Sequence, residues 1–464
     1  MDTAPQERLG APAAAALPGV EPYGLQREML LRAEYGPDGS PIAHRYPPVH
    51  ELLVLRGPLE AELLARAARE VLADVDVLRG RLRSYDGTVR WVPDRGRPPA
   101  RLAEIAPGPA RQVIRTVLRQ AAEESFHLQE DPAARLLLAR TGTEEHLLLI
   151  ALDHACADGR TLVLIIRHLL RRYALLKGER TTLPAPFPAF HDFARRFAEG
   201  SADRAAARTY WAQALKRAAD PRRRPVFPGA DSGLRPPYST DAAAQTPLGA
   251  QDLDTINALA SAVDADRHRL LLAVTQLTLS AWSDAADPRF VPVNYFRNGR
   301  HRRDWLNVPG PLAEHAVTVP PARTADRLRD WLAGFVQANA ASPPLYGLSL
   351  RELETPESEA NRIAVFNFLP PLGRLKAAGL RILPPPPELA AEMEPEDQTA
   401  RFPLRVRLVQ DMDAPLVFRV EHDPRVLPDG APFIAAALGL VEAASARPEL
   451  PLAEAYRLIR RHFT

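Results

Sequence analysis

The chain has 464 residues, a length that favours two lobes because single hydrophobic cores rarely grow beyond ~250–300 residues. Its 59 basic and 57 acidic residues nearly cancel, which argues against a nucleic-acid surface built on overall charge. The single cysteine, Cys156, excludes an internal disulfide and a cysteine-rich zinc site, and the lack of a signal-peptide pattern or an apolar run of ~18 residues predicts a cytoplasmic protein with no membrane partner.

Residues 1–180 alternate short apolar runs with helical periodicity, which predicts an N-terminal lobe that mixes strands and helices. In chain order, the pattern predicts a strand over 49–56, a helix over 59–75, a hairpin about the Asp86-Gly87 turn and a helix over 111–127. The next strong strand, residues 146–152, has few polar interruptions, so we expect it to be buried on both faces. An amphipathic helix follows Gly159 and ends near Gly178.

Residues 181–250 are rich in proline and polar residues, and we interpret them as a crossover or linker region between the lobes. Residues 251–464 again mix helices and strands and are expected to form a C-terminal lobe. Its expected elements are helices over 253–283, 323–340 and 431–446, and strands over 289–296, 362–369, 401–411 and 415–423. The whole pattern predicts an α/β protein made of two α+β two-layer sandwiches of related design, side by side.

The stretch ALDHACADGR, residues 151–160, is the main candidate for chemistry. It places His154 at the end of the buried strand, where an imidazole with one free ring nitrogen can serve as a general base. Asp158 could hydrogen-bond the histidine loop or pair with an arginine elsewhere, and Gly159 would let the chain turn sharply into the next helix. The plainer alternative is a strand–loop–helix turn with a capping aspartate and a surface histidine, and the spacing alone favours that alternative.

Two neighbours of His154 carry alternatives of their own. Cys156 could act as a nucleophile with His154 as its base, although a lone cysteine in an apolar stretch is usually inert packing. Asp153 could raise the pKa of His154, or it could be a solvent-facing loop residue. Trp282 and Trp305 are expected in the core. The chain has no phosphate-binding glycine loop, dinucleotide fingerprint, serine-hydrolase elbow or zinc-protease helix motif, so the corresponding enzyme classes are not indicated.

The same stretch resembles the H-H-x-x-x-D-G signature of the condensation domains of nonribosomal peptide synthetases, which belong to the chloramphenicol acetyltransferase-like acyltransferase superfamily. The first histidine of that signature is Asp153 here, whereas the second, the functional one in the family, is kept as His154. The resemblance covers nearly the whole chain in the expected order. The other stretches that carry it are VLRGPLEAELLARAAREVLADVDVLRGRLR, SFHLQEDPAARLLLAR, PAFHDFARRF, YWAQAL, NGRHRRDWLNVPGPLAEHAVTVP, AVFNFLPP and FPLRVRLVQDMDAPLVFRVEHD.

The resemblance implies two such lobes arranged as a V, with a tunnel between them. A donor acyl group would arrive as a thioester on the phosphopantetheine arm of an acyl or peptidyl carrier protein, and a small amine or alcohol acceptor would enter from the opposite face. His154 would deprotonate or position the nucleophile and stabilise the tetrahedral oxyanion. No metal or tightly bound cofactor is implied, because a thioester is already activated.

The resemblance also implies roles for the residues around the motif. Gly159 would allow a close backbone approach. Asp158 would be structural and would pair with an arginine of the second lobe, for which Arg300 is the first choice and Arg297 the alternative. His315, near the glycine of the second-lobe motif, would either line the tunnel or be a strand or loop residue with no chemical role.

Two functions of different classes follow from these expectations. The first is a free-standing condensation enzyme that joins a carrier-bound acyl or aminoacyl thioester to an amine or alcohol, giving an amide or an ester in natural-product biosynthesis. The chain shows no adenylation or carrier segment, so its partners would come in trans. The second is a non-catalytic domain of the same fold that recruits a carrier protein for another enzyme. The intact His154, Asp158 and Gly159 favour catalysis. Epimerisation is a third reading, with no independent support.

Overall fold

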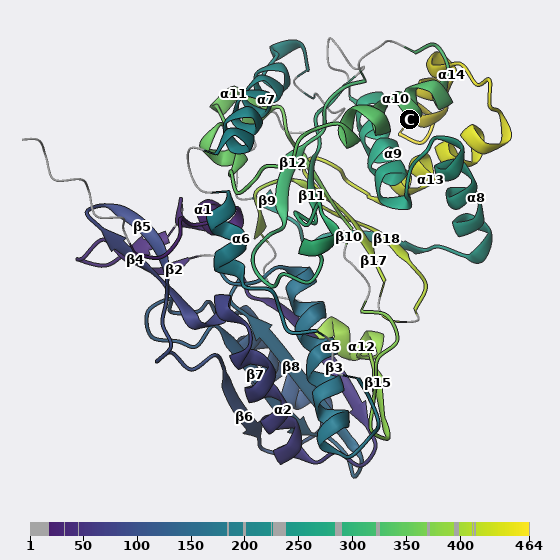
Figure 1. Ribbon diagram of the computed structural model, residues 1–464. Coiled ribbons are helices and arrows are strands. Elements are labelled where there is room, and N and C mark those ends of the chain that lie inside the picture. The colour runs from purple at the N-terminus through teal and green to yellow at the C-terminus, as the bar shows by residue number, and fades with distance from the viewer. Residues whose placement is uncertain are drawn as a thin grey trace, which may run out of the picture.

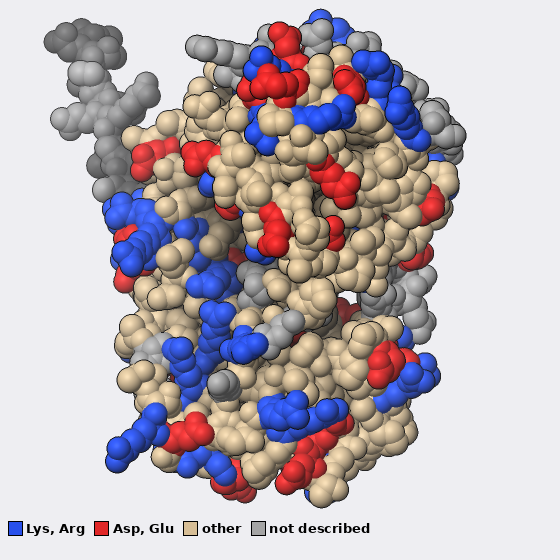
Figure 2. Space-filling model, turned by 90° about the vertical axis from the view of Figure 1, so that its right-hand side faces the viewer, with Lys and Arg blue, Asp and Glu red and all other residues tan. Residues whose placement is uncertain are grey.

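The computed structural model describes residues 18–463 except 32, 45, 183–184, 198–200, 224, 226–237, 284–289, 322–324, 369–371, 394–398, 411 and 413. Two six-stranded sheets organise these residues, and each sheet has helices packed against it. Figure 1 shows the two resulting lobes one above the other, and Figure 2 shows the molecular surface hollowed where the lobes meet. The expected α/β architecture of two sheet-and-helix lobes is confirmed.

The first lobe is built on a sheet with the strand order β14-β15-β3-β8-β7-β6. Its strands are β3 (Val49–Arg56), β6 (Arg101–Ile105), β7 (Ala134–Arg140), β8 (Glu145–Leu152), β14 (Lys376–Ala377) and β15 (Leu380–Leu383). Helices α2 (Ala61–Ala73) and α5 (Gly159–Leu176) belong to the apolar core on one face. The other face is covered by α3 (Ala110–Val113), the π-helical turn η2 (Ile114–Leu118) and α4 (Arg119–Glu123).

Strand β8 is buried on both faces, as its continuous apolar run predicted. Leu148 and Ile150 pack into the core beneath α2 and α5, whereas Leu147 and Leu149 pack into the core on the opposite face. The strand pairs along its length with β3 on one side and β7 on the other. Since both of its edges and both of its faces are occupied, β8 is a rigid support for the loop that follows Leu152.

The second lobe is built on a sheet with the strand order β10-β18-β17-β13-β11-β12. Its strands are β10 (Ala242–Pro247), β11 (Asn294–Arg297), β12 (Glu314–Val317), β13 (Ala364–Phe368), β17 (Leu404–Val409) and β18 (Val417–His422). The helices that share its core are α8 (Ala250–Ala262), α9 (Arg267–Trp282), α10 (Leu328–Ala340), α13 (Ala431–Ala446) and α14 (Leu452–Arg460). In Figure 1 these helices lie on the side of the sheet away from the first lobe. Trp282 and Trp305 are buried, as expected.

Smaller elements surround the two sheets. The remaining strands form the two-stranded pairs β1 (Ala33–Tyr35) with β2 (Pro41–His44), β4 (Gly80–Tyr85) with β5 (Thr88–Pro93), and β9 (Tyr238–Ser239) with β16 (Thr399–Ala400). The remaining α-helices are α1 (Leu25–Leu30), α6 (Phe190–Arg196), α7 (Ala202–Ala218), α11 (Pro356–Ala360) and α12 (Pro387–Ala390). The short 3-10 turns are η1 (Asp76–Arg79), η3 (Pro221–Arg223), η4 (Arg303–Trp305), η5 (Leu350–Glu352) and η6 (Ala391–Met393). The β4–β5 hairpin turns at Asp86 and Gly87, as predicted.

Two strand segments belong to a different part of the fold from the one predicted from their position in the chain. Strand β10, expected within a linker region, is an edge strand of the second sheet. Hairpin β14–β15, expected within the C-terminal lobe, crosses over and pairs with β3 of the first sheet, with Ile382 opposite Leu55. An unpaired strand edge leaves backbone N–H and C=O groups without partners, and β15 satisfies those of β3. Within the described residues, no helix is both long enough and apolar enough to span a membrane.

Candidate active site

The loop between β8 and α5 has a fixed conformation. The Cys156 N–H donates to the Asp153 carbonyl at 2.8 Å, and the Ala155 N–H donates to the Asp153 carboxylate at 2.8 Å. Asp158 ends the loop by capping α5, where its Oδ1 accepts the Thr161 N–H at 2.8 Å. Within residues 153–158, His154 is the one residue that is not buried. The loop therefore leaves His154 partly exposed and buries the other residues.

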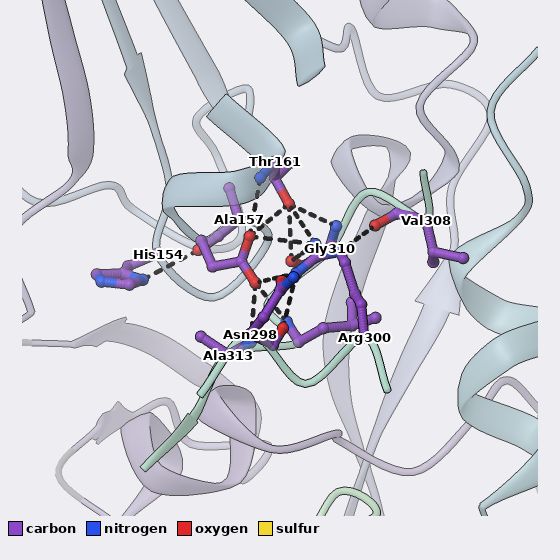
Figure 3. A network of polar contacts seen from close by, with 10 residues as sticks. His154, Ala157, Thr161, Asn298, Arg300, Val308, Gly310 and Ala313 are labelled. Carbon is purple, nitrogen blue, oxygen red and sulfur yellow. Dashed lines mark hydrogen bonds and ion pairs between the residues drawn. The ribbon is translucent and has the colours of Figure 1, made fainter. Parts of the chain in front are cut away.

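The two ring nitrogens of His154 have different surroundings. Nδ1 lies 3.0 Å from the Ala157 carbonyl oxygen, and because a carbonyl can only accept, Nδ1 carries the proton of the neutral ring. No described residue forms a hydrogen bond with Nε2, which leaves its lone pair free. Figure 3 shows the ring on one side of Ala157, directed away from the polar network on the other side. The ring of Tyr46 contacts it edge-on at 6.4 Å between centroids.

The surroundings of His154 keep its ring neutral at neutral pH. Burial lowers the pKa of His154 below its ordinary value, and the hydrogen bond to the Ala157 carbonyl offsets only part of that effect. A neutral imidazole with a free Nε2 can accept a proton. The surroundings of His154 favour this state, whereas those of a surface histidine in an ordinary turn do not. The charge of Asp158 acts to raise the pKa of His154, and whether Asp153 also does so stays a prediction.

A buried ion pair joins the two lobes beside this loop. Arg300 donates from both terminal nitrogens to Asp158, at 2.8 and 3.1 Å, and the side chains are 0% and 3% exposed. Of the two arginines expected to pair with Asp158, Arg300, the first choice, is the one that does so. Burial acts to raise the pKa of Asp158, but the charge and hydrogen bonds of Arg300 lower it below its ordinary value. The pair is therefore fully charged at neutral pH.

The remaining polar atoms of this pair also have partners. The Leu312 and Ala313 N–H groups donate to Asp158 Oδ2 at 3.0 and 2.8 Å, and Arg300 Nε donates to the Val308 carbonyl at 3.0 Å. Thr161 lies between Asp158 and the Gly310 backbone, with its hydroxyl 2.8–2.9 Å from each. Figure 3 shows this network from close by. A buried pair stabilises a structure only when its remaining hydrogen-bonding groups are satisfied, and here they are.

Gly299 and Gly310 make this network possible, whereas Gly159 does not contribute to it. At Gly299 the backbone has φ +69°, and an added Cβ would lie 1.7 Å from the Leu312 carbonyl oxygen. At Gly310, with φ +148°, an added Cβ would lie 2.5 Å from the Phe190 ring. Gly159 is the first residue of α5, and an added Cβ would meet nothing within 4 Å. A sharp turn is therefore not the reason for a glycine at 159. Gly299 and Gly310 lie in a stretch that carries the family resemblance, but the sequence reasoning gave no role to them or to Thr161.

Asp153 is a buried partner of a second histidine, not a solvent-facing residue. Its Oδ1 lies 2.9 Å from His44 Nε2, and both side chains are almost fully buried. The Tyr46 N–H donates to His44 Nδ1 at 3.2 Å, so the proton of His44 is on Nε2 and points to Asp153. Burial acts to raise the pKa of Asp153, but the hydrogen bonds from His44 and the Ala155 N–H lower it below its ordinary value. The hydrogen bond between Asp153 and His44 thus connects the active-site loop to strand β2.

The other two candidate residues of the second lobe belong to separate ion pairs. Arg297 pairs with the buried Glu314 at 2.7 Å and so is not the partner of Asp158. His315 Nδ1 lies 3.6 Å from Glu28 of α1, and its ring is stacked on Phe296 at 4.9 Å between centroids. His315 is thus a strand residue in a contact between α1 and the second sheet, and whether it also lines a passage stays a prediction.

Cys156 is a buried and unreactive residue of the core. It is buried, and burial together with the charge of Asp153 raises the pKa of its thiol well above the ordinary value. A thiol with a raised pKa stays protonated and is a poor nucleophile. The alternative of a cysteine nucleophile with His154 as its base therefore has no support in this geometry.

We expect Asp158→Asn to lower the free energy of unfolding by about 3–5 kcal/mol, because it leaves the buried Arg300 guanidinium without a counter-charge. Urea unfolding followed by circular dichroism measures this loss. The matched control is Asp304→Asn, which breaks the exposed pair of Asp304 with Arg302 and should leave the unfolding midpoint unchanged. Equal midpoints for the two variants would contradict the role given to the inter-lobe pair.

The loss of stability caused by Asp153→Asn should depend on pH. A carboxyl group whose pKa is lower in the folded state contributes stability above its unfolded pKa of ~3.9 and loses it as the pH falls through the folded pKa. The difference in unfolding free energy from the unchanged protein should therefore be largest above pH 5 and shrink below pH 4. Urea unfolding at pH 7, 5 and 3 tests this, and a difference that grows toward pH 3 is the contrary result.

Three comparisons with known proteins bear on this site. The family model described as "Condensation domain" matches residues 49–312, more than half of the chain. Chondramide synthase cmdD of Chondromyces crocatus is 29% identical over 192 residues, which are 38% of this chain and 5% of that protein. AMB antimetabolite synthetase AmbE of Pseudomonas aeruginosa is 28% identical over 289 residues, 60% of this chain and 13% of that protein. The chain thus matches only a small part of these curated relatives.

Solved structures of the same fold cover almost the whole chain. SgcC5 of Streptomyces globisporus aligns with a TM-score of 0.67 at 18% identity, over 93% of this chain and 100% of that one. The first condensation domain of the calcium-dependent antibiotic synthetase has a TM-score of 0.67 at 17% identity, covering 94% and 97%. The X-domain from teicoplanin biosynthesis has a TM-score of 0.68 at 17% identity, covering 95% and 98%. These likenesses show the fold, and the family model over more than half of the chain shows that the chain belongs to the condensation-domain family.

Proposed function

We propose that this condensation-family chain is an acyltransferase that joins a carrier-bound acyl or aminoacyl thioester to an amine or alcohol acceptor. One observation carries the proposal: the Ala157 carbonyl holds the proton of His154 on Nδ1 and so presents Nε2 as a free base in a partly exposed position. The lowered pKa of His154 supports it, because the ring is then neutral where the reaction takes place.

In the proposed reaction, Nε2 of His154 accepts a proton from the acceptor nitrogen or oxygen as that atom attacks the thioester carbon. The resulting imidazolium lies beside the tetrahedral oxyanion and stabilises its charge. When the C–S bond breaks, the proton passes to the leaving sulfur, so that the products are an amide or ester and the free thiol of the phosphopantetheine arm. No other group has to supply electrons or protons, and no bound cofactor is part of the proposal.

The remaining catalytic advantage would come from positioning. Two substrates held in a passage between the lobes need only a base and a defined orientation, and effective molarities in such arrangements are equivalent to ~7–11 kcal/mol of barrier. The pair between Asp158 and Arg300 supports this role, because it fixes the His154 loop relative to the second lobe. Gly159, with open space at the position of its missing Cβ, would let a substrate approach the backbone there.

The carrier protein is proposed to arrive in trans, with the amine or alcohol as a second, small substrate. A non-catalytic domain that holds a carrier protein for another enzyme is the competing function. The likeness to the X-domain does not favour it, because at 17% identity that likeness shows the fold alone. The free Nε2 of His154 supports catalysis, since a docking domain has no need of a base in a partly exposed loop.

His154→Ala should lower the rate of acyl transfer by ~10²–10⁴-fold, because general acid–base catalysis contributes about that much. The assay mixes the protein with acyl-loaded carrier protein and a panel of amines and alcohols and follows product by mass spectrometry. The matched control is His146→Ala, which changes a histidine at the opposite end of the same strand and should keep the normal rate. A normal rate in His154→Ala would rule out His154 as the base.

The dependence of kcat/KM on pH should follow the neutral form of His154. Because burial lowers its pKa, the ring is neutral throughout the range above its ordinary value of 6.5, and with an alcohol acceptor, which does not titrate there, kcat/KM should be level. The rate should fall only at lower pH, as Nε2 takes up a proton. Rates measured between pH 5 and 9, corrected for thioester hydrolysis without enzyme, test this. A half-maximal rate at pH 7 or above would contradict the assigned environment.

A further inference from the structure

The hydrogen bond to the Ala157 carbonyl does not by itself fix the direction of Nε2 of His154. A hydrogen bond to a carbonyl oxygen tolerates a broad range of angles, so a ring held at Nδ1 alone can still tilt. Among the described residues, Tyr46 is the only one whose ring contacts that of His154, with 6.4 Å between the centroids and 80° between the planes. Rings at this separation favour a perpendicular arrangement, so Tyr46 restricts the tilt of the imidazole.

The far end of the Tyr46 side chain is anchored. Its hydroxyl donates to Oε1 of Glu28, a residue of α1, at 3.1 Å. Burial acts to raise the pKa of Glu28, but its contact with His315 and the charges of two arginines lower that pKa to about 2. An ionised carboxylate can only accept hydrogen bonds, so the hydroxyl proton of Tyr46 points to Glu28. The hydroxyl thus holds the ring in place and does not serve as a proton donor to a substrate.

The backbone of Tyr46 is fixed by the first lobe. Its N–H donates to Nδ1 of His44 at 3.2 Å, and Nε2 of His44 lies 2.9 Å from the Asp153 carboxylate. Asp153 is the first residue of the loop that carries His154. The Tyr46 side chain is therefore held at its backbone by the start of this loop and at its hydroxyl by α1, which leaves the ring little freedom to turn.

Helix α1 is attached to the second lobe, although it precedes the first sheet in the chain. Glu28 lies 2.8 Å from Nε of Arg351 in η5, and both side chains are almost fully buried. The preceding residue of α1, Arg27, forms a second ion pair with Glu352 in the same turn of the second lobe. In Figure 1, α1 lies at the level where the two lobes meet. The carboxylate that anchors the tyrosine hydroxyl is thus held in place by the second lobe.

We propose that Tyr46 is a positioning residue for His154, and that its ring holds the imidazole in the orientation that presents Nε2 to the acceptor substrate. This inference rests on the proposed acyl transfer and adds a residue to the arrangement that would perform it. It also gives the second lobe an influence on the base, because the pair of Glu28 and Arg351 holds Tyr46, and Tyr46 holds the ring. His154 is then supported from two sides, through Ala157 and through Tyr46, and each support depends on an ion pair between the lobes.

The first experiment measures acyl transfer by Tyr46→Phe and Tyr46→Leu. Tyr46→Leu removes the ring contact and should lower kcat by ~10²-fold, the loss expected when a reacting group is misplaced by about 1 Å. Tyr46→Phe keeps the ring but loses the bond to Glu28, so its kcat should lie between those of Tyr46→Leu and the unchanged protein. Because Tyr46 acts through His154 and not on a substrate, the KM values for donor and acceptor should stay nearly unchanged.

The matched control is Tyr35→Leu, which removes an exposed tyrosine of β1 whose hydroxyl donates to the Leu30 carbonyl at 2.7 Å, and it should keep the normal rate. A kcat of Tyr46→Phe equal to that of the unchanged protein, or to that of Tyr46→Leu, overturns the inference, because one of the two contacts then has no role. So does a loss that appears mainly in KM, which would mean that Tyr46 binds a substrate. Circular dichroism checks each fold, and if Tyr46→Leu is unfolded, a lowered or a normal kcat of Tyr46→Phe decides the test.

The second experiment needs no substrate. Nitrogen-15 NMR of the His154 ring at pH 8 reports which nitrogen carries the proton, and in the unchanged protein and in Tyr35→Leu this should be Nδ1, bound to the Ala157 carbonyl. In Tyr46→Leu the ring should also populate orientations in which Nδ1 leaves that carbonyl, so that both neutral tautomers are present. A ring that keeps its proton on Nδ1 alone in Tyr46→Leu overturns the inference, because Tyr46 then does not hold it.

The two experiments separate the inference from the function on which it rests. If no acceptor shows His154-dependent transfer, the proposed acyl transfer fails, while the tautomer of His154 still shows whether Tyr46 holds the ring. If transfer occurs but neither kcat nor the tautomer responds to Tyr46→Leu, the function stands and the inference fails.

Discussion

The buried ion pair between Asp158 and Arg300 is the interaction on which the arrangement of this protein depends. Two charges removed from water are stable only when each is neutralised and every remaining hydrogen-bonding atom has a partner. Here Asp158 caps α5 of the first lobe and accepts backbone N–H groups of the second, while Arg300 reaches across from the loop after β11. One pair thus fixes the helix start, the inter-lobe contact and the loop that carries His154.

The same constraint determines which nitrogen of the His154 ring carries the proton and which is free. Because both ends of the loop are held, by Asp153 at β8 and by Asp158 at α5, the backbone places the Ala157 carbonyl against one ring nitrogen. The ring is left neutral, with its other nitrogen free. In place of the first histidine of the family signature, this chain has a carboxylate that is bound to His44, and this pair holds one end of the loop.

Patterns in the sequence predicted the local parts of this structure. The apolar run before Asp153 predicted a strand buried on both faces, and the choice of Arg300 as the partner of Asp158 came from the resemblance to the family. Long-range contacts were missed: nothing near β15 shows that it completes a sheet over 300 residues earlier, and nothing near Asp153 points to His44. Such contacts depend on the fold and not on spacing along the chain.

The central claim is that His154 is a neutral base whose proton is held on Nδ1. Nitrogen-15 NMR of the imidazole rings, with His154→Gln used to assign the resonance, tests it most directly. The account predicts that at pH 7 the His154 ring is neutral, with a protonated Nδ1 and an unprotonated Nε2, and that it titrates below its ordinary pKa of 6.5. A ring that is cationic at pH 7, or that carries its proton on Nε2, would contradict it.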